Sequence, residues 1–443
     1  MHAGAVALAA AALAGLTAGT RADASFTAPV ELAAAQFGLA ATSATDAAGT
    51  TTVVVTGSGA PKLLERPAGA VWPAPIRLPG DPRGVTGPVV AAAGEGALGI
   101  AWRVDTPRKY GGIQAEVRDP GGALSTPIVI AGDHARGVRH PALAADPAGD
   151  TLLAYNTDTR KSHLSMSGAI AVSYRPAHGS FSKPVVLDDE PSTPPAVALA
   201  PDGTGIVAWS HNRRVYAASI ARGRVGRAEE VAASSGLRNV VAVAGPDGEA
   251  TIAWIRSGAS DRRYQIRVLR RGGGERFAVQ AVASTRANVP ELVLATDEAG
   301  RTTAAWIEQD FGHPGESDRD STAIGVATAA SGHAFGSPRV VTKSTARERR
   351  SLSIAALNGR VALAWGVARD RHHLAVQAAA GPVTALGPPQ TIASMTFTGD
   401  FFVPVPGTRI TLAPSGAATV LATIPTQPSP NLITSRLVAI DGR

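Results

Sequence analysis

Short runs of alternating apolar and polar residues fill the chain from about residue 25 onward, and Gly, Pro, Asp and Asn separate them. The stretch PDGTGIVAW at 201–209 shows the pattern, because a turn containing glycine leads into an alternating run that ends in Ala-Trp. The same phrase returns as PDGEATIAW at 246–254. Period-two alternation between turn signals predicts β-strands rather than helices.

The phrase recurs through the whole chain when the chain is aligned on the glycine of the turn. The eight glycines are Gly49, Gly96, Gly149, Gly203, Gly248, Gly300, Gly359 and Gly416. Six residues after them lie Val55, Trp102, Tyr155, Trp209, Trp254, Trp306, Trp365 and Ala422. Five of the six tryptophans therefore share one position, and eight copies spaced by roughly 45–60 residues indicate a repeat protein.

Each copy carries the pattern of four antiparallel strands, for example the apolar run 195–200, the strand that ends in Ala-Trp, a third strand at 215–220 and a fourth of the kind seen at 179–187. Such units cannot bury both faces alone and are typical of β-propeller blades. We predict an all-β fold, a single β-propeller of eight four-stranded blades. Seven blades is the alternative, since Val55 and Ala422 lack an aromatic ring. The tryptophans are predicted to fill the wedge between blades.

The predicted repeats lie near 37–78, 88–131, 141–188, 195–232, 239–283, 290–342, 351–393 and 409–440. The last repeat stops before a fourth strand, and SFTAPVELA at 25–33 matches the fourth-strand form GSFSKPVVL at 179–187. We therefore predict that strand 25–33 pairs into the C-terminal blade and closes the ring of 25–443. Closure would remove open sheet edges that invite aggregation.

This pattern resembles that of secreted bacterial β-propeller repeat proteins with PDG-type turns, in the WD40-like and sialidase-like superfamilies. The resemblance covers about residues 25–443 and matches no specific family within them. The Gly-His…Trp-Asp signature of WD40 repeats is absent, and the glycine-to-tryptophan interval differs from that of the sialidase Asp-box. The resemblance implies a fold and leaves the activity open.

The N-terminal segment and the composition narrow the protein class. An Ala/Leu-rich run is followed by Ala22-Asp23-Ala24, which predicts a signal peptide at 1–24 and a secreted or periplasmic protein with no transmembrane segment in the mature chain. A plain N-terminal helix is the alternative. The chain has no cysteine, which excludes disulfides, thiol nucleophiles and thiolate metal sites. Its net charge of +7 favours anionic partners.

The sequence contains no cofactor-binding motif in the structural context that it requires, and we predict no cofactor. Residues 94–99 spell GxGxxG but join two strands, whereas a dinucleotide site requires a strand followed by a helix. The loop 310–321 offers Asp310, Asp318 and Asp320 as weak calcium candidates, although their spacing fits no defined calcium loop. A solvated acidic loop is the favoured interpretation.

Basic residues concentrate in the loops that follow the second strand of each repeat, often as dibasic pairs with a tyrosine nearby. The candidate binding residues are Arg108, Lys109, Tyr110, Arg160, Lys161, Arg213, Arg214, Arg262, Arg263, Tyr264, Arg369 and Arg371. In a propeller these loops share one rim, so they would give it a positive potential. We expect an anionic glycan or an acidic protein as the partner, with nucleic acid less favoured. Ordinary solvated loop charge is the alternative interpretation.

Three functions remain open from the sequence. The preferred hypothesis is a monomeric, non-catalytic binding module that engages an anionic polymer or acidic protein through the basic rim. The second is a glycoside hydrolase or polysaccharide lyase that uses loop carboxylates, for which a hydrolase would require a carboxylate pair. The third is an envelope scaffold for protein–protein interaction.

Overall fold

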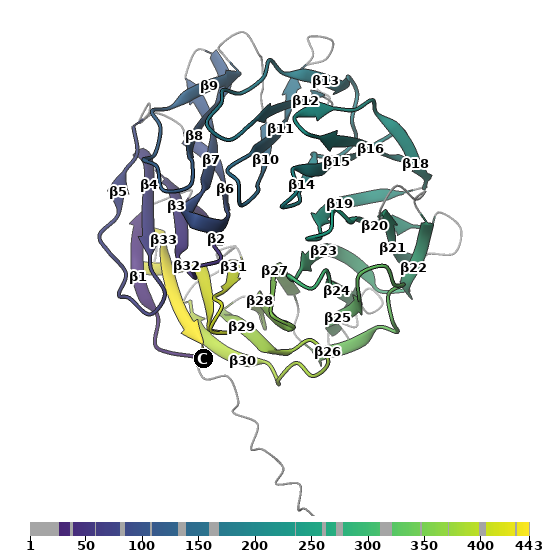
Figure 1. The fold of residues 1–443 in the computed structure, drawn as a ribbon. Coiled ribbons are helices and arrows are strands. Elements are labelled where there is room, and N and C mark those ends of the chain that lie inside the picture. Colours follow the sequence, from purple (N-terminus) through teal and green to yellow (C-terminus); the bar gives the residue numbers. More distant parts are fainter. Residues whose placement is uncertain are drawn as a thin grey trace, which may run out of the picture.

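The structure of the protein is a computed structural model. It describes residues 26–35, 39–57, 59–79, 85–106, 109–131, 139–158, 168–234, 236–258, 263–271, 278–310, 321–345, 348–370, 372–397, 405–429 and 432–442. Eight antiparallel sheets surround a central channel (Figure 1). The eight-bladed β-propeller is therefore confirmed, and the seven-bladed alternative is excluded.

Blades 1 to 4 follow the chain in order, each running from the channel outward. Blade 1 comprises β2 (Ala40–Thr45), β3 (Thr51–Gly57), β4 (Gly59–Arg66) and β5 (Ile76–Arg77); blade 2 comprises β6 (Val85–Ala92), β7 (Leu98–Thr106), β8 (Lys109–Arg118) and β9 (Ile128–Ala131). Blade 3 comprises β10 (Arg139–Ala145), β11 (Thr151–Asp158), β12 (Gly168–Arg175) and β13 (Val185–Asp188); blade 4 comprises β14 (Ala196–Leu199), β15 (Thr204–His211), β16 (Arg214–Ala221), β17 (Arg224–Val225) and β18 (Glu229–Ala233). The outer edge of blade 4 is thus divided between two short strands that both pair with β16.

Blades 5 to 8 complete the ring. Blade 5 comprises β19 (Leu237–Ala244), β20 (Ala250–Ser257), β21 (Tyr264–Arg271) and β22 (Ala278–Thr285); blade 6 comprises β23 (Asn288–Thr296), β24 (Thr302–Asp310), β25 (Ser321–Ala329) and β26 (Arg339–Ser344). Blade 7 comprises β27 (Glu348–Leu357), β28 (Arg360–Ala368), β29 (His373–Pro382) and β30 (Gln390–Thr396); blade 8 comprises β31 (Gly407–Leu412), β32 (Ala418–Ser429), β33 (Leu432–Gly442) and β1 (Val30–Ala35). The helical content of the described residues is one 3-10 turn, η1 (Gly94–Gly96), which occupies the GxGxxG segment between β6 and β7.

The N-terminal strand closes the ring as predicted. β1 pairs antiparallel with β33, from Val30 opposite Ala439 to Ala35 opposite Ser435, and Phe26 forms a further bridge with Gly442. The strand begins just after Pro29, which has no N–H to give to a β-ladder. The first described residues therefore supply the outer strand of the last blade.

The tryptophan position packs the blades against one another. Trp102, Trp209, Trp254, Trp306 and Trp365 are all buried, with at most 1% of their surface exposed, and the alanine before each is equally buried. Successive side chains on a strand point to opposite faces, so the indole fills one interface while the alanine lets the next sheet approach. Gly325 lies opposite Trp306 in the ladder, and a Cβ added there would overlap the indole.

Ion pairs at the outer end of the third strands also join neighbouring blades. The pairs are Arg66 with Asp441, Arg118 with Glu65, and Arg175 with Asp119. Arg118 and Arg175 each contact both oxygens of the partner carboxylate, a bidentate geometry that fixes orientation as well as distance. These bonds tie blades 8, 1, 2 and 3 together at one rim of the ring.

The described chain contains no helix that is long and apolar enough to cross a bilayer. The predicted signal peptide at 1–24 lies outside the described residues. Secretion therefore stays a prediction from the sequence.

Candidate functional site at the channel mouth

One rim of the ring carries the starts of all first strands and the ends of all second strands. We call it the upper rim and define it by Glu348, where β27 begins, and Ala368, where β28 ends. The turns with the repeated glycines lie at the opposite, lower rim, as Gly203 does between β14 and β15. The upper rim is therefore where residues from all eight blades can meet a ligand at the mouth of the channel.

The structure places the predicted basic residues on this upper rim but in separate blades. Arg213 and Arg214 form the turn from β15 to β16, Arg263 and Tyr264 stand at the start of β21, and Arg369 follows β28. Lys109 and Tyr110 begin β8, whereas Arg108, Arg160, Lys161, Arg262 and Arg371 lie outside the described residues. The described members are spread around the ring rather than gathered in one pocket.

Of the three predicted calcium ligands, the structure describes one. Asp310 ends β24 and is exposed, and Asp318 and Asp320 lie outside the described residues. Within the part of the chain that the structure describes, no group of three or more His, Asp or Glu side chains is arranged to hold a metal ion. Calcium binding in this loop stays a prediction from the sequence.

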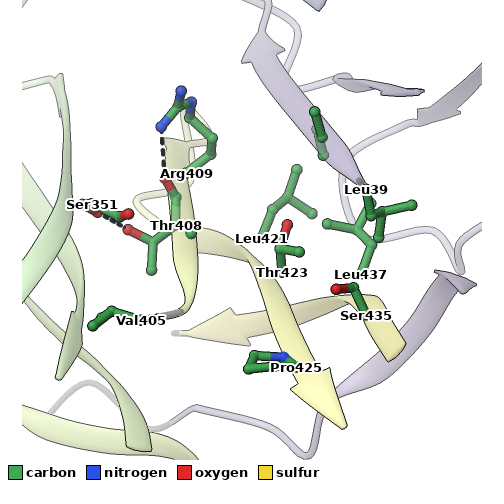
Figure 2. Close-up of a pocket in the computed structure, with 13 residues that line it drawn as sticks. Leu39, Ser351, Val405, Thr408, Arg409, Leu421, Thr423, Pro425, Ser435 and Leu437 are labelled. Carbon is green, nitrogen blue, oxygen red and sulfur yellow. Dashed lines mark hydrogen bonds between the residues drawn. The ribbon is translucent and has the colours of Figure 1, made fainter. Parts of the chain in front are cut away.

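A cavity of about 400 Å³ opens at the upper rim where blades 7, 8 and 1 meet (Figure 2). This volume falls within the range of small-molecule sites. Its lining residues are Leu39, Ala40, Ala41, Ser351, Val405, Gly407, Thr408, Arg409, Leu421, Thr423, Pro425, Ser435 and Leu437. Ser351, Thr408 and Arg409 form its polar side, and Leu39 before β2 with the leucines of β32 and β33 forms the apolar side. We call this cavity the channel-mouth pocket.

The polar side of the pocket is held in place by the neighbouring first strand. Ser351 lies in a β-bulge of β27 with φ of 59°, a left-handed conformation that is uncommon for a residue other than glycine. The Glu291 carboxylate from β23 accepts the N–H groups of Ser351 at 2.8 Å and of Leu352 at 2.6 Å. The Thr408 hydroxyl donates to the Ser351 carbonyl. Contacts from two blades therefore fix the bulge at the pocket edge.

Arg409 supplies the positive charge of the pocket. Arg409 is exposed, and its Nη1 donates to the Thr408 carbonyl at 2.9 Å. The surrounding protein lowers the pKa of the guanidinium by desolvation, while the nearby Glu291 carboxylate raises it. Arginine stays protonated under such opposing influences, so the pocket presents a cation. Because Glu291 is engaged with backbone amides, Arg409 retains donors for a ligand.

Other first strands repeat the bulge that shapes this pocket. Gly87, His140 and Asn239 also have positive φ values, between 48° and 57°, inside bulges of β6, β10 and β19. Each lies nine residues before the turn glycine of its repeat, in an otherwise apolar run. A glycine or polar residue that recurs at this place in an apolar run is the sequence signal for the channel mouth. The prediction from loop charges did not use it.

The comparisons with known proteins show the fold. No family model matches this chain. No curated protein matches it either. The chain is similar to a structure from a study of two prolyl endopeptidases (12% identity, 88% of this chain and 55% of that chain, TM-score 0.49), so it spans about half of that protein. It is also similar to the polysaccharide lyase Uly1 (11% identity, 79% and 89%, TM-score 0.43) and to a Dyadobacter fermentans protein of unknown function (13%, 81% and 95%, TM-score 0.43).

These likenesses agree with the predicted resemblance to β-propellers, and they include a neuraminidase-like protein. Identities between 7% and 13% carry the fold alone. The kinds of protein among the similar structures nevertheless correct the preferred functional hypothesis. The similar structures are mostly of enzymes, among them glycoside hydrolases and a lyase, so the prediction of a non-catalytic binding module was wrong. The alternative of a glycoside hydrolase or polysaccharide lyase is better supported.

Proposed function

We propose that this protein is an enzyme that cleaves an acidic polysaccharide by β-elimination, with a uronate unit held in the channel-mouth pocket. The observation that carries the proposal is the pairing of a 400 Å³ pocket with Arg409 as the cation at its polar edge. A planar guanidinium binds a carboxylate through two parallel hydrogen bonds. The apolar side of the pocket suits the carbon face of a sugar ring.

The chemistry of elimination matches what Arg409 can supply. A base removes the proton on the carbon next to the uronate carboxyl group, the electrons of that C–H bond form a C=C bond, and the bond to the neighbouring sugar oxygen breaks. The departing oxygen then takes up a proton. Negative charge develops on the carboxyl group in the transition state, so a fixed cation beside it lowers the barrier.

The base for this step must lie within hydrogen-bond reach of the same sugar unit whose carboxyl group Arg409 holds. His140, the histidine in the bulge of β10, lies in blade 3 and does not line the channel-mouth pocket, so it is not suited to that role. Arg409 is therefore the residue to which we assign a part in the reaction.

Elimination is favoured over hydrolysis by the carboxylates at this site. Hydrolysis of a glycoside uses two carboxyl groups, one of which must be protonated to act as the acid. The described carboxylate beside the pocket is Glu291, which accepts two backbone N–H groups and lies near Arg409. Its oxygens are already bonded to these backbone N–H groups, so Glu291 is suited to positioning the bulge rather than to acting on a substrate.

The test is incubation of the purified protein with polygalacturonate, alginate, hyaluronan and chondroitin sulfate. Elimination produces both new reducing ends and the ultraviolet absorbance of an unsaturated uronate, whereas hydrolysis produces reducing ends alone. Arg409→Ala is expected to lower kcat/KM by about 10²-fold or more, since it removes a donor aimed at developing charge.

Matched variants separate these roles from general damage. Arg224→Ala removes an exposed arginine at the lower rim of blade 4 and should leave the rate unchanged. Glu291→Gln keeps one acceptor for the two amides and should lower kcat/KM about tenfold, which corresponds to roughly 1.4 kcal/mol. Reducing ends without ultraviolet absorbance would replace elimination by hydrolysis, and no product from any of the polymers would refute the proposal.

A further inference from the structure

A cluster of bonded aromatic and charged side chains lies at the upper rim of blade 4, on the opposite side of the ring from the channel-mouth pocket (Figure 1). Its members are Asp188, Trp209, His211, Arg214, Tyr216 and Glu230, and we call it the blade 4 platform.

Asp188 fixes the orientation of His211 in this platform. Its carboxylate is nearly buried, at 7% exposure, and accepts the Trp209 indole N–H at 2.6 Å and the Glu190 backbone N–H at 2.9 Å. The His211 Nδ1 lies 2.9 Å from both Asp188 oxygens. Because the carboxylate accepts there, Nδ1 carries the hydrogen and Nε2 faces outward, where the Asn212 side-chain amide meets it at 2.7 Å.

The aromatic rings of the platform form a stack that reaches the surface. Tyr216 lies nearly parallel to the buried Trp209, with ring centroids 6.0 Å apart and an interplanar angle of 17°. The His211 ring is tilted against Tyr216 at a centroid distance of 6.1 Å. Tyr216 is half-buried, so this packing fixes it while part of its ring stays accessible. A fixed, half-exposed aromatic ring is suited to stacking against a sugar ring.

Cations flank this ring. Arg214 forms an ion pair with Glu230 at 2.5 Å and keeps 53% of its side chain exposed, and the guanidinium lies close to Tyr216. Arg213 beside it is exposed in a turn without glycine, where Asn212 and Arg213 have φ values of 46° and 63°. Positive φ at both positions is the geometry of a two-residue β-hairpin turn, which here carries Arg213 and Arg214 at the tip of β15 and β16. The platform therefore combines an aromatic surface with donors for a carboxylate.

The other blades show that the fold does not require this arrangement. Tyr216 stands opposite the repeated tryptophan, and in the other seven blades the same position holds Lys62, Gln114, Ala171, Arg267, Gly325, Gln377 and Val438. The indole N–H groups of other blades find different acceptors, such as Ser234 and Glu308. Packing between blades therefore explains the tryptophan but not Tyr216, His211 and Asp188 together.

We infer that the blade 4 platform is a second glycan subsite, which binds an acidic sugar unit through Tyr216 and Arg214. The inference rests on the proposed function, because the ligand is a distant unit of the same polysaccharide. Tyr216 stacks on the sugar ring and Arg214 receives its carboxylate, while His211, bonded to Asp188 and Asn212, packs against Tyr216 and holds it in place. The subsite increases affinity for long chains that reach from blade 4 to the channel mouth.

The test measures binding independently of cleavage, by electrophoresis through gels that contain polygalacturonate, alginate, hyaluronan or chondroitin sulfate, with dextran as the uncharged reference. The starting protein carries Arg409→Ala, so that turnover and pocket binding do not contribute. It is expected to be retarded by at least one acidic polymer. Adding Tyr216→Ala or Arg214→Glu should weaken that retardation about tenfold in apparent Kd.

Arg224→Glu is the matched control, since it makes the same charge change at an exposed arginine on the lower rim of the same blade. Arg214→Glu changes an exposed side chain and guards against loss of folding in Tyr216→Ala. Equal weakening by Arg224→Glu, or retardation that neither platform variant changes, overturns the subsite, as does a lack of retardation in every acidic gel. Retardation that depends on the platform, without cleavage by the wild-type protein, would instead refute the proposed reaction and leave the binding site standing.

Discussion

A carboxyl group buried without a partner, Glu116, makes the stability of the ring dependent on pH. Glu116 lies in β8 opposite Ile100 and has no exposed surface. Neither side-chain oxygen has a hydrogen-bond partner among the described residues. It shares a face of the strand with Arg118, which bonds to Glu65 of blade 1, so it points into the interface of blades 1 and 2. Desolvation raises the pKa of Glu116 from 4.5 to about 7.

The size of the effect follows from proton linkage. Between pH 4.5 and about 7 the native state holds a proton on Glu116 that the unfolded chain has released. The free energy of unfolding therefore falls as the pH rises through this window and levels off above it. A shift of this size corresponds to about 3 kcal/mol, at 1.36 kcal/mol for each pKa unit. The same ladder position holds Leu64 in blade 1 and Leu269 in blade 5, so the site is compatible with an apolar side chain.

The assay is urea unfolding of wild type and Glu116→Leu from pH 4 to pH 8, followed by tryptophan fluorescence. The variant should gain little or no stability near pH 4 and up to about 3 kcal/mol at pH 8. Only the difference between the two proteins is interpreted, because their other titrations cancel. Glu229→Gln, which changes an exposed glutamate, should give a flat difference. A flat difference for Glu116→Leu as well would show that the carboxyl is solvated in the native state, and the argument would fail.

Two further predictions concern packing and closure of the ring. Gly325→Ala places a methyl group against the Trp306 indole and should destabilise the protein by about 1–3 kcal/mol in urea unfolding. Gly59→Ala, at a strand position with open space and no positive φ, tests glycine replacement without a clash and should cost less; equal effects would refute the packing argument. Deletion through Ala35 removes β1 and exposes the edge of β33, so it should lower Tm and promote association in light scattering, while deletion of 1–24 should do neither; an unchanged Tm after the longer deletion would contradict closure by β1.

The fold was predictable because every repeat shows the same local sequence pattern. The turn glycines and the alternation recur eight times and the Ala-Trp ending five times, so an exception in one repeat, such as the missing aromatic ring at Val55, is outweighed by the others. The circular closure followed from a strand that was missing at one end and surplus at the other. What the repeats did not predict is the division of the outer edge of blade 4 into β17 and β18, since a second tight turn after β16 depends on a few local residues.

The candidate site was much less predictable. Charge in loops is conspicuous in a sequence, and it led to basic residues that the structure spreads over several blades. The channel-mouth pocket instead joins Ser351 and Arg409, which are 58 positions apart and carry no shared motif. Their proximity depends on the order of the blades, and the fixing of Ser351 depends on Glu291 from a third blade. Such contacts follow only from the closed ring.

Comparison between blades offers a way to separate function from packing in this protein. Residues that differ from the repeat pattern occur in two kinds of environment in this protein. Glu116 differs from the repeat inside a blade interface, and its carboxyl group has no hydrogen-bond partner among the described residues. It should therefore lower the free energy of unfolding above pH 4.5. Tyr216 departs at the upper rim, where stacked rings and hydrogen bonds hold its neighbourhood in place. Contacts that fix an accessible group are what recognition requires, because a fixed group loses little freedom on binding. Departures of the second kind, at the upper rim and with bonded neighbours, are therefore where we place recognition of the ligand by this propeller.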